Sequence, residues 1–182
     1  VDMIPTSVMG LLGSPELKEE VLIPWMQDEE DEYRGCWTVM DPDRGSDYIT
    51  SMTHPNPEEY GIRGFCIAKP AGNEWVINGV KSYWTSSAPC ATWALVHPII
   101  PPHRGPQDLG MAIVPLNLPG VTVSPPIDKL GTRDDPQGEI VFDNVRVPEH
   151  YMICSDSTLS RQLVKCLIAN TSCAIANMFV GV

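Results

Sequence analysis

Three short segments carry the residues best suited to contact a ligand. The first, residues 39–47, reads Val-Met-Asp-Pro-Asp-Arg-Gly-Ser-Asp. It could form a loop whose backbone and hydroxyl groups face a ligand, although an Asp-Pro turn followed by a Gly-Ser turn would read the same way. Local chemistry alone favours the pair of turns.

The second segment, residues 81–87, places the aromatic pair Tyr83 and Trp84 directly before hydroxyl-bearing residues. The rings could stack on a planar cofactor while the hydroxyl groups hydrogen-bond to its heteroatoms. Alternatively, Tyr83 and Trp84 lie on opposite faces of one strand, with one of them in the core. The local sequence does not separate these two interpretations.

The third segment combines Lys-Leu-Gly-Thr-Arg at residues 129–133 with an alternating apolar run at residues 138–148. The alternation is interrupted at Asp143-Asn144, which predicts a bulged or bent strand. Signals for other chemistries are absent from the sequence. The four histidines have no His or Cys partner at metal-ligand spacing, and neither GxSxG nor GxGxxG occurs. We therefore expect no metal site.

Short strands must position these segments. Apolar runs separated by turn residues predict strands at residues 35–40, 61–69, 75–78, 80–85, 92–97, 110–115, 121–124 and 139–147. Asn78-Gly79 predicts a two-residue hairpin, because both central positions of a tight primed turn need positive φ. With 18 Pro and 14 Gly scattered along the chain, we expect a mainly β domain, an antiparallel barrel or sandwich.

Helices are expected on both sides of this domain. Ser14 is a candidate N-cap, and Pro15 suits the first helical position. Pro24 should end or kink this helix. A second helix is expected from about Ser157 to the end. This order suggests divisions at residues 1–33, 34–150 and 151–182, and the chain ends predict a fragment of a longer protein.

Composition excludes several classes of function. The 12 Lys+Arg and 23 Asp+Glu give a net charge of −11, which disfavours nucleic-acid binding. The six cysteines form no CxxC motif and are expected to be reduced, buried thiols of an intracellular protein. Polar residues such as Lys165 and Asn170 interrupt the apolar tract at residues 163–182, so a buried helix is expected there and no membrane span.

Together, the order and spacing of these segments resemble the acyl-CoA dehydrogenase family. Its middle domain carries (Thr/Ser)-Glu-Pro-x-x-Gly-Ser-Asp, Asn-Gly-x-Lys-x-(Trp/Tyr)-x-(Thr/Ser), Lys-Leu-Gly-x-Arg and Phe-x-x-Val-x-Val-Pro. These motifs correspond here to residues 40–47, 78–85, 129–133 and 142–148. The match covers roughly residues 13–148, and four motifs in order are far more specific than any one of them.

The resemblance implies a three-domain protein with a helical N-terminal domain, a β-barrel middle domain and a C-terminal four-helix bundle. This chain would hold the end of the first, the whole of the second and the start of the third. The implied chemistry is FAD-dependent oxidation of the CH–CH bond of an acyl-CoA, in which a carboxylate takes the α-proton and flavin N5 takes a hydride. The parent protein is expected to be a homo-oligomer.

Carried over position by position, the resemblance assigns FAD contacts to several residues and a substrate contact to one. The FAD contacts are Trp37, Thr38, Val39, Met40, Gly45, Tyr83, Trp84 and Thr85. Tyr83 would pack beside the isoalloxazine, and Thr85 would hydrogen-bond near N5. Ser46 would approach the CoA portion of the substrate.

The chain also departs from the family pattern. Met40 replaces a Thr or Ser and so removes a side-chain hydrogen bond to the flavin, while Asp41 replaces Glu, a smaller change. Residues 154–160 replace a glycine-rich hinge. The catalytic carboxylate would lie beyond Val182, or in a minority of members near Thr171, where this chain has no acid. No catalytic residue is therefore assigned within the chain.

Two alternative functions stay open at this point. Flavin-dependent hydroxylases and nitroalkane oxidases share the same architecture with different chemistry. The other is a non-catalytic remnant that keeps the fold as a binding domain. The changes at Met40 and in the hinge favour it, whereas the preserved Tyr83 and Thr85 favour a flavin site.

Overall fold

The computed structural model describes residues 3–42, 44–54, 56 and 64–180. Two four-stranded sheets form its centre. The first has the order β1-β4-β5-β8, with β1 at Gly35–Thr38, β4 at Trp93–Val96, β5 at Met111–Pro115 and β8 at Met152–Cys154. The second has the order β2-β3-β7-β6, with β2 at Ile67–Ala71, β3 at Glu74–Ser86, β7 at Gln137–Pro148 and β6 at Val121–Val123.

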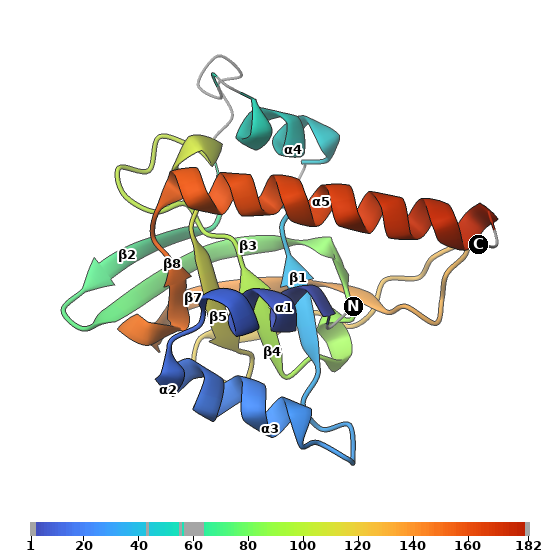
Figure 1. Ribbon diagram of the computed structural model, residues 1–182, viewed down its shortest axis with the longest axis horizontal. Helices are drawn as coiled ribbons and strands as arrows, with labels where there is room; N and C mark the ends of the chain where they lie inside the picture. Colours follow the sequence, from blue (N-terminus) through green and yellow to red (C-terminus); the bar gives the residue numbers. More distant parts are fainter. Residues whose placement is uncertain (1–2, 43, 55, 57–63, 181–182) are drawn as a thin grey trace.

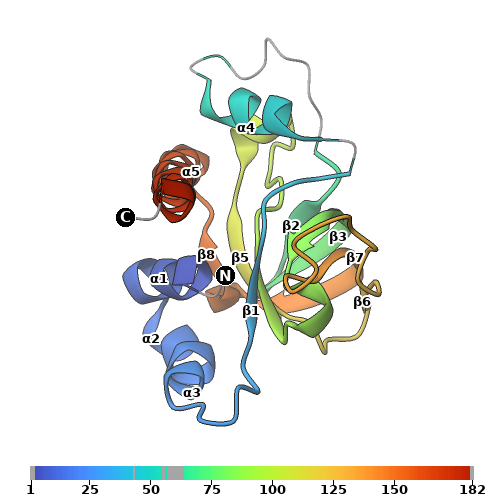
Figure 2. The ribbon, with the colours of Figure 1, turned by 90° about the vertical axis from the view of Figure 1, so that its right-hand side faces the viewer.

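Helices cover the outer face of the first sheet, and the second sheet covers its inner face (Figure 2). These helices are α1 at Met3–Leu12, α2 at Pro15–Leu17, α3 at Ile23–Met26 and α5 at Ser157–Val180, whereas α4 at Ser46–Thr53 lies beyond one end of the sheet. Figure 1 shows α5 running along the length of the molecule, with α4 beside it. The mainly β fold with flanking helices is confirmed, as a sandwich of two sheets.

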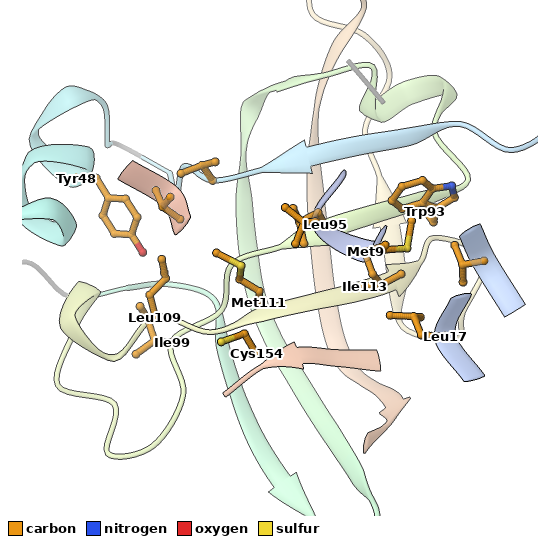
Figure 3. Close-up of a cluster of buried hydrophobic side chains, with 14 residues drawn as sticks. Met9, Leu17, Tyr48, Trp93, Leu95, Ile99, Leu109, Met111, Ile113 and Cys154 are labelled. Carbon is orange, nitrogen blue, oxygen red and sulfur yellow. The ribbon is translucent and has the colours of Figure 1, made fainter. Parts of the chain in front are cut away.

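Alternation along the central strands explains these layers. On β4, Trp93 and Leu95 belong to the cluster beneath the helices, whereas Ala94 and Val96 belong to the cluster between the sheets. Successive side chains of a strand point to opposite faces, so larger residues meet the helices and smaller ones meet the second sheet. Figure 3 shows Met9 beside Trp93 in the helix-side cluster, to which Leu17 also belongs.

The prediction of a hairpin at Asn78-Gly79 is wrong. The two-residue turn lies at Gly72-Asn73, between the paired residues Ala71 and Glu74. Gly79 sits inside the continuous strand β3 with φ of 128°, and a Cβ there would lie 1.9 Å from the Phe65 carbonyl oxygen. The positive φ therefore serves a close crossing of two backbones and not a turn.

The irregularity expected at Asp143-Asn144 is confirmed. On β7, two residues stand opposite Asn78 of β3, because Ile77 pairs with Val145 and Gly79 pairs with Phe142. Asn144 has φ of 52°, and its backbone N–H donates to Asn78 Oδ1 at 2.9 Å. A bulge of this kind bends the strand that carries it and increases the local twist.

The first predicted helix forms, but Pro24 does not end it. Ser14 is the N-cap, and its Oγ accepts from Leu17 N at 3.2 Å, as expected. The chain stays helical to Met26 through a π-helical turn at Lys18–Leu22, closed by a bond from Ile23 N–H to the Lys18 carbonyl. The wider turn accommodates Pro24, which has no N–H to donate to the preceding turn.

Other expectations were only partly right. The strand pairing of β1 with β4 is parallel, while the other ladders are antiparallel. The predicted strand at residues 35–40 ends at Thr38, and that at 61–69 begins at Ile67, with residues 61–63 outside the described ranges. Helices α1 and α4 and strand β8 were not predicted.

The expectation that the cysteines are buried is wrong for Cys90 and Cys166, which are exposed. Within the described ranges, no helix is long and apolar enough to cross a membrane.

Candidate functional site

A cavity of about 450 Å³ opens beside the end of β1. Its volume falls in the range of small-molecule sites, roughly 300–1,000 Å³. The lining residues come from α1, β1 and the loop after it, α4, the end of β3, and α5. They are Ile4, Trp37, Val39, Met40, Ile49, Trp84, Thr85, Ser86, Ile168 and Thr171. Most are apolar, and the hydroxyl groups belong to Thr85, Ser86 and Thr171, so the cavity suits a flat, largely apolar ligand with a few polar atoms.

Strand β1 and the loop after it form one wall. Trp37, Val39 and Met40, three of the residues to which the resemblance assigns FAD contacts, line the cavity. Trp37 donates its Nε1–H to His97 Nε2 at 2.7 Å, so its polar atom has a partner within the protein. Thr38 points the other way: it is buried, and its Oγ1 donates to the Leu95 carbonyl at 3.1 Å.

The end of β3 forms a second wall through a wide bulge. Lys81 pairs with Ile140 and Thr85 with Gly138, so three residues of β3 stand opposite one residue of β7. Ser82 stabilises this bulge, because its Oγ accepts from Trp84 N at 3.3 Å and its carbonyl accepts from Thr85 Oγ1 at 2.9 Å. The bulge brings Trp84, Thr85 and Ser86 to the cavity.

Neither aromatic residue of this bulge lies in the core. Tyr83 is 39% exposed and Trp84 is 53% exposed. Their ring centroids are 5.0 Å apart at an interplanar angle of 50°, so the two rings contact each other. The interpretation that one of them packs in the core is therefore wrong, because the bulge removes the strict alternation of the strand. Trp84 lines the cavity and Tyr83 does not.

Gly45 and Ser46 stand apart from the cavity, at the start of α4. Gly45 precedes the helix, and Ser46 is its exposed first residue. The Asp47 carboxylate accepts from Gly45 N at 2.7 Å, and this hydrogen bond lowers the pKa of Asp47. A negative charge thus sits at the helix start, where it is favoured by the helix dipole.

A buried ion pair lies behind the cavity wall. Lys81 Nζ is 2.7 Å from Asp41 Oδ1, and both side chains are fully buried. Lys81 Nζ also donates to the Val39 carbonyl at 3.2 Å and to the His97 carbonyl at 2.7 Å. Asp41 Oδ2 accepts from Phe65 N at 2.7 Å. Each charged atom is therefore matched, which a buried pair requires.

His97 is held neutral in this cluster. Burial, and to a smaller extent the nearby Lys81 charge, lower the pKa of its imidazole to about 3. Indole Nε1 can only donate, so His97 Nε2 must carry the lone pair that accepts from Trp37. Sequence reasoning missed both His97 and the Lys81–Asp41 pair. The available signal was a lysine inside an apolar strand, since an unpaired lysine is costly to bury.

Comparison with known proteins agrees with this arrangement. The family model for the acyl-CoA dehydrogenase middle domain matches residues 36–145. A probable acyl-CoA dehydrogenase of Mycobacterium tuberculosis is 29% identical over 158 residues, which cover 87% of this chain and 36% of that protein. The short-chain specific acyl-CoA dehydrogenase, mitochondrial, of Homo sapiens is 29% identical over 139 residues, 75% of this chain and 29% of that protein.

Solved structures agree as well. A glutaryl-CoA dehydrogenase from Mycobacterium smegmatis, in complex with FADH2, superposes with a TM-score of 0.66 at 28% identity and covers 88% of this chain and 36% of that one. The chain thus spans about a third of the length of these relatives. Because the family model matches more than half of its residues, the chain belongs to the acyl-CoA dehydrogenase family, with residues 36–145 corresponding to the middle domain.

Proposed function

We propose that this chain supplies the flavin-binding part of an FAD-dependent oxidoreductase that oxidises the CH–CH bond of an acyl-CoA. The observation that carries the proposal is the cavity between β1 and the end of β3, where two family motifs converge on one apolar space. The mycobacterial relative solved with FADH2 supports the choice of cofactor. The complete activity is that of the whole protein, because this chain spans only about a third of the length of its relatives.

The residues around the cavity fit an isoalloxazine ring. Trp37, Val39, Met40 and Trp84 would bound the ring with apolar and aromatic surface. Thr85 already donates its hydroxyl hydrogen to the Ser82 carbonyl, so its oxygen is available as an acceptor. FAD, when bound, would supply the hydride acceptor, and the chain would orient it and exclude water.

The remaining assignments belong to the same proposal. Thr38, Gly45 and Tyr83, which do not line the cavity, would support FAD binding from beside it, and Ser46 would contact the CoA portion. None of the residues lining the cavity is an acid, so we assign α-proton abstraction to a carboxylate elsewhere in the parent protein. We also propose that the parent protein is intracellular and homo-oligomeric. Its domains would divide this chain into residues 1–33, 34–150 and 151–182.

An absorbance spectrum of the purified parent protein tests the proposal, followed by anaerobic titration with a panel of acyl-CoAs. Flavin bands that bleach on addition of one thioester would support it. Bleaching by a nitroalkane, or flavin-dependent hydroxylation, would replace it with the alternative chemistry on the same fold. A colourless protein that refuses added FAD would contradict it and leave the binding-domain remnant.

A matched pair of variants adds a control. Thr85→Val removes the hydroxyl at the cavity with little change in volume, whereas Thr85→Ser keeps it. Weaker FAD binding in the first variant only would support a polar role for Thr85. Equal FAD binding by both variants would contradict that role.

A further inference from the structure

A continuous buried chain of polar contacts runs behind the cavity wall. Trp37 Nε1 donates to His97 Nε2 at 2.7 Å, and the His97 carbonyl accepts from Lys81 Nζ at 2.7 Å. His97 and Lys81 are both fully buried, whereas Trp37 reaches the cavity. The contacts therefore connect a lining side chain to two residues that no ligand in the cavity could touch.

The same cluster also holds the backbone of the lining loop. Lys81 Nζ donates to the Val39 carbonyl at 3.2 Å, and the next residue, Ser82, donates its N–H to the Met40 carbonyl at 2.9 Å. Two successive carbonyl groups of the loop are thus bound by two successive residues of β3. The Val39 carbonyl belongs to the peptide group that joins Val39 to Met40, and both residues line the cavity. Lys81 therefore fixes the backbone position from which these two side chains extend.

The direction of the Trp37 hydrogen bond determines which part of this residue faces a ligand. Its N–H is used toward His97, whose ring meets the indole edge-on with centroids 6.1 Å apart. Turning the indole would leave a buried imidazole nitrogen without its donor, which costs about 1–3 kcal/mol. The orientation of Trp37 is consequently locked from behind, and only its apolar surface is offered to the cavity.

We propose that His97 and Lys81 are positioning residues of the cavity, His97 by orienting the Trp37 indole and Lys81 by fixing the Val39–Met40 backbone. The identity of the ligand, FAD, rests on the proposed function, whereas the positioning itself rests on the contacts above. Neither residue contacts the ligand, and each acts through a residue that does.

The test compares His97→Leu, which removes the acceptor, with His97→Gln, which retains one. In the parent protein labelled with ¹⁵N-tryptophan, Trp37→Phe identifies the Trp37 indole resonance. We expect His97→Leu to move that resonance, to weaken FAD binding about tenfold and to change the visible circular dichroism of the bound flavin. A tenfold change corresponds to about 1.4 kcal/mol. His97→Gln should retain all three properties.

A double-mutant cycle separates positioning from general loss of structure. If His97 acts through Trp37, His97→Leu should have no further effect on FAD affinity in a Trp37→Phe background. A loss that persists in that background would overturn the role of His97. Lys81→Met should weaken FAD binding even when Trp37 is Phe, because Lys81 also holds Val39. An unchanged affinity would overturn the role of Lys81.

Failure of the proposed function gives a different result. If the wild-type protein binds no FAD, the proposed cofactor is wrong, yet the Trp37 resonance still reports the hydrogen bond that orients the indole. A Trp37 resonance that is the same in wild type and His97→Leu would overturn the inference regardless of FAD. If His97→Leu does not fold, the comparison of His97→Gln with Trp37→Phe is decisive, since only the latter should then lose affinity.

Discussion

Lys81 and Asp41 meet in the interior 2.7 Å apart, although 40 positions separate them along the chain. Both are fully buried, and each makes further hydrogen bonds to backbone groups of other segments. The pair joins the loop after β1 to the middle of β3. The same loop contributes Val39 and Met40 to the cavity lining, and the end of β3 contributes Trp84, Thr85 and Ser86. The ion pair and two walls of the candidate site therefore depend on the same crossing.

Removing one partner of this pair should destabilise the fold strongly. Lys81→Met leaves the Asp41 carboxylate buried without its counter-ion, and loss of one partner in such a pair typically costs about 3–5 kcal/mol. Denaturation by urea, followed by circular dichroism, measures the change in free energy of unfolding. The double variant Lys81→Met, Asp41→Leu serves as control and should recover part of the loss. A single-variant loss below about 1 kcal/mol would contradict the importance of the pair.

Stability should fall as the pH drops below about 6.5, because His97 is neutral in the folded state. Its pKa is lowered to about 3 by burial, whereas an unfolded histidine titrates near 6.5. Between these values the unfolded chain binds the extra proton, so stability is lost as the pH falls. The His97 share amounts to roughly 1 kcal/mol between pH 6 and pH 5.

His97→Gln isolates that contribution from those of the carboxylates. The difference in free energy of unfolding between wild type and this variant should change between pH 6 and pH 5 and stay constant between pH 7 and pH 8. A difference that is flat over the acid range would show that His97 takes up a proton without unfolding the chain.

Gly79→Ala should be more damaging than Gly72→Ala. Both positions have positive φ, of 128° and 71°, so both variants carry a backbone penalty of about 1–2 kcal/mol. Only at Gly79 would the new Cβ meet backbone atoms, at 1.9 Å from the Phe65 carbonyl oxygen, whereas nothing lies within 4 Å at Gly72. Thermal unfolding of the two variants measures the difference. Equal melting temperatures would mean that the crossing of β3 with residue 65 is not tight.

Sequence patterns predicted most reliably those features that depend on residues adjacent in the chain. Ser14 and Pro15 start a helix through local hydrogen bonds, and Asn144 marks a bulge through its own φ. Asn78-Gly79 misled because positive φ at a glycine serves a turn or a crossing equally well. Only the distant Phe65 carbonyl distinguishes the two uses.

For the site, family motifs identified five residues that line the cavity: Trp37, Val39, Met40, Trp84 and Thr85. The alternation rule failed at Tyr83 and Trp84, because it does not anticipate a bulge of three residues against one. His97 and the parallel pairing of β1 with β4 depend on contacts between distant segments, which no local pattern contains.

Trp84 should matter more for FAD binding than Tyr83, although the resemblance pointed to Tyr83 as the residue beside the ring. Trp84 lines the cavity, whereas Tyr83 contacts only the Trp84 ring among the described aromatic pairs. Aromatic contacts contribute about 0.5–1.5 kcal/mol beyond buried area, so Trp84→Ala should weaken FAD binding by at least about two- to twelvefold. Tyr83→Ala, which is similarly exposed, is the matched control and should have a smaller effect. Quenching of FAD fluorescence on titration with each variant measures both affinities. A larger loss for Tyr83→Ala would mean that the bulge rearranges on binding so that Tyr83 turns to the flavin.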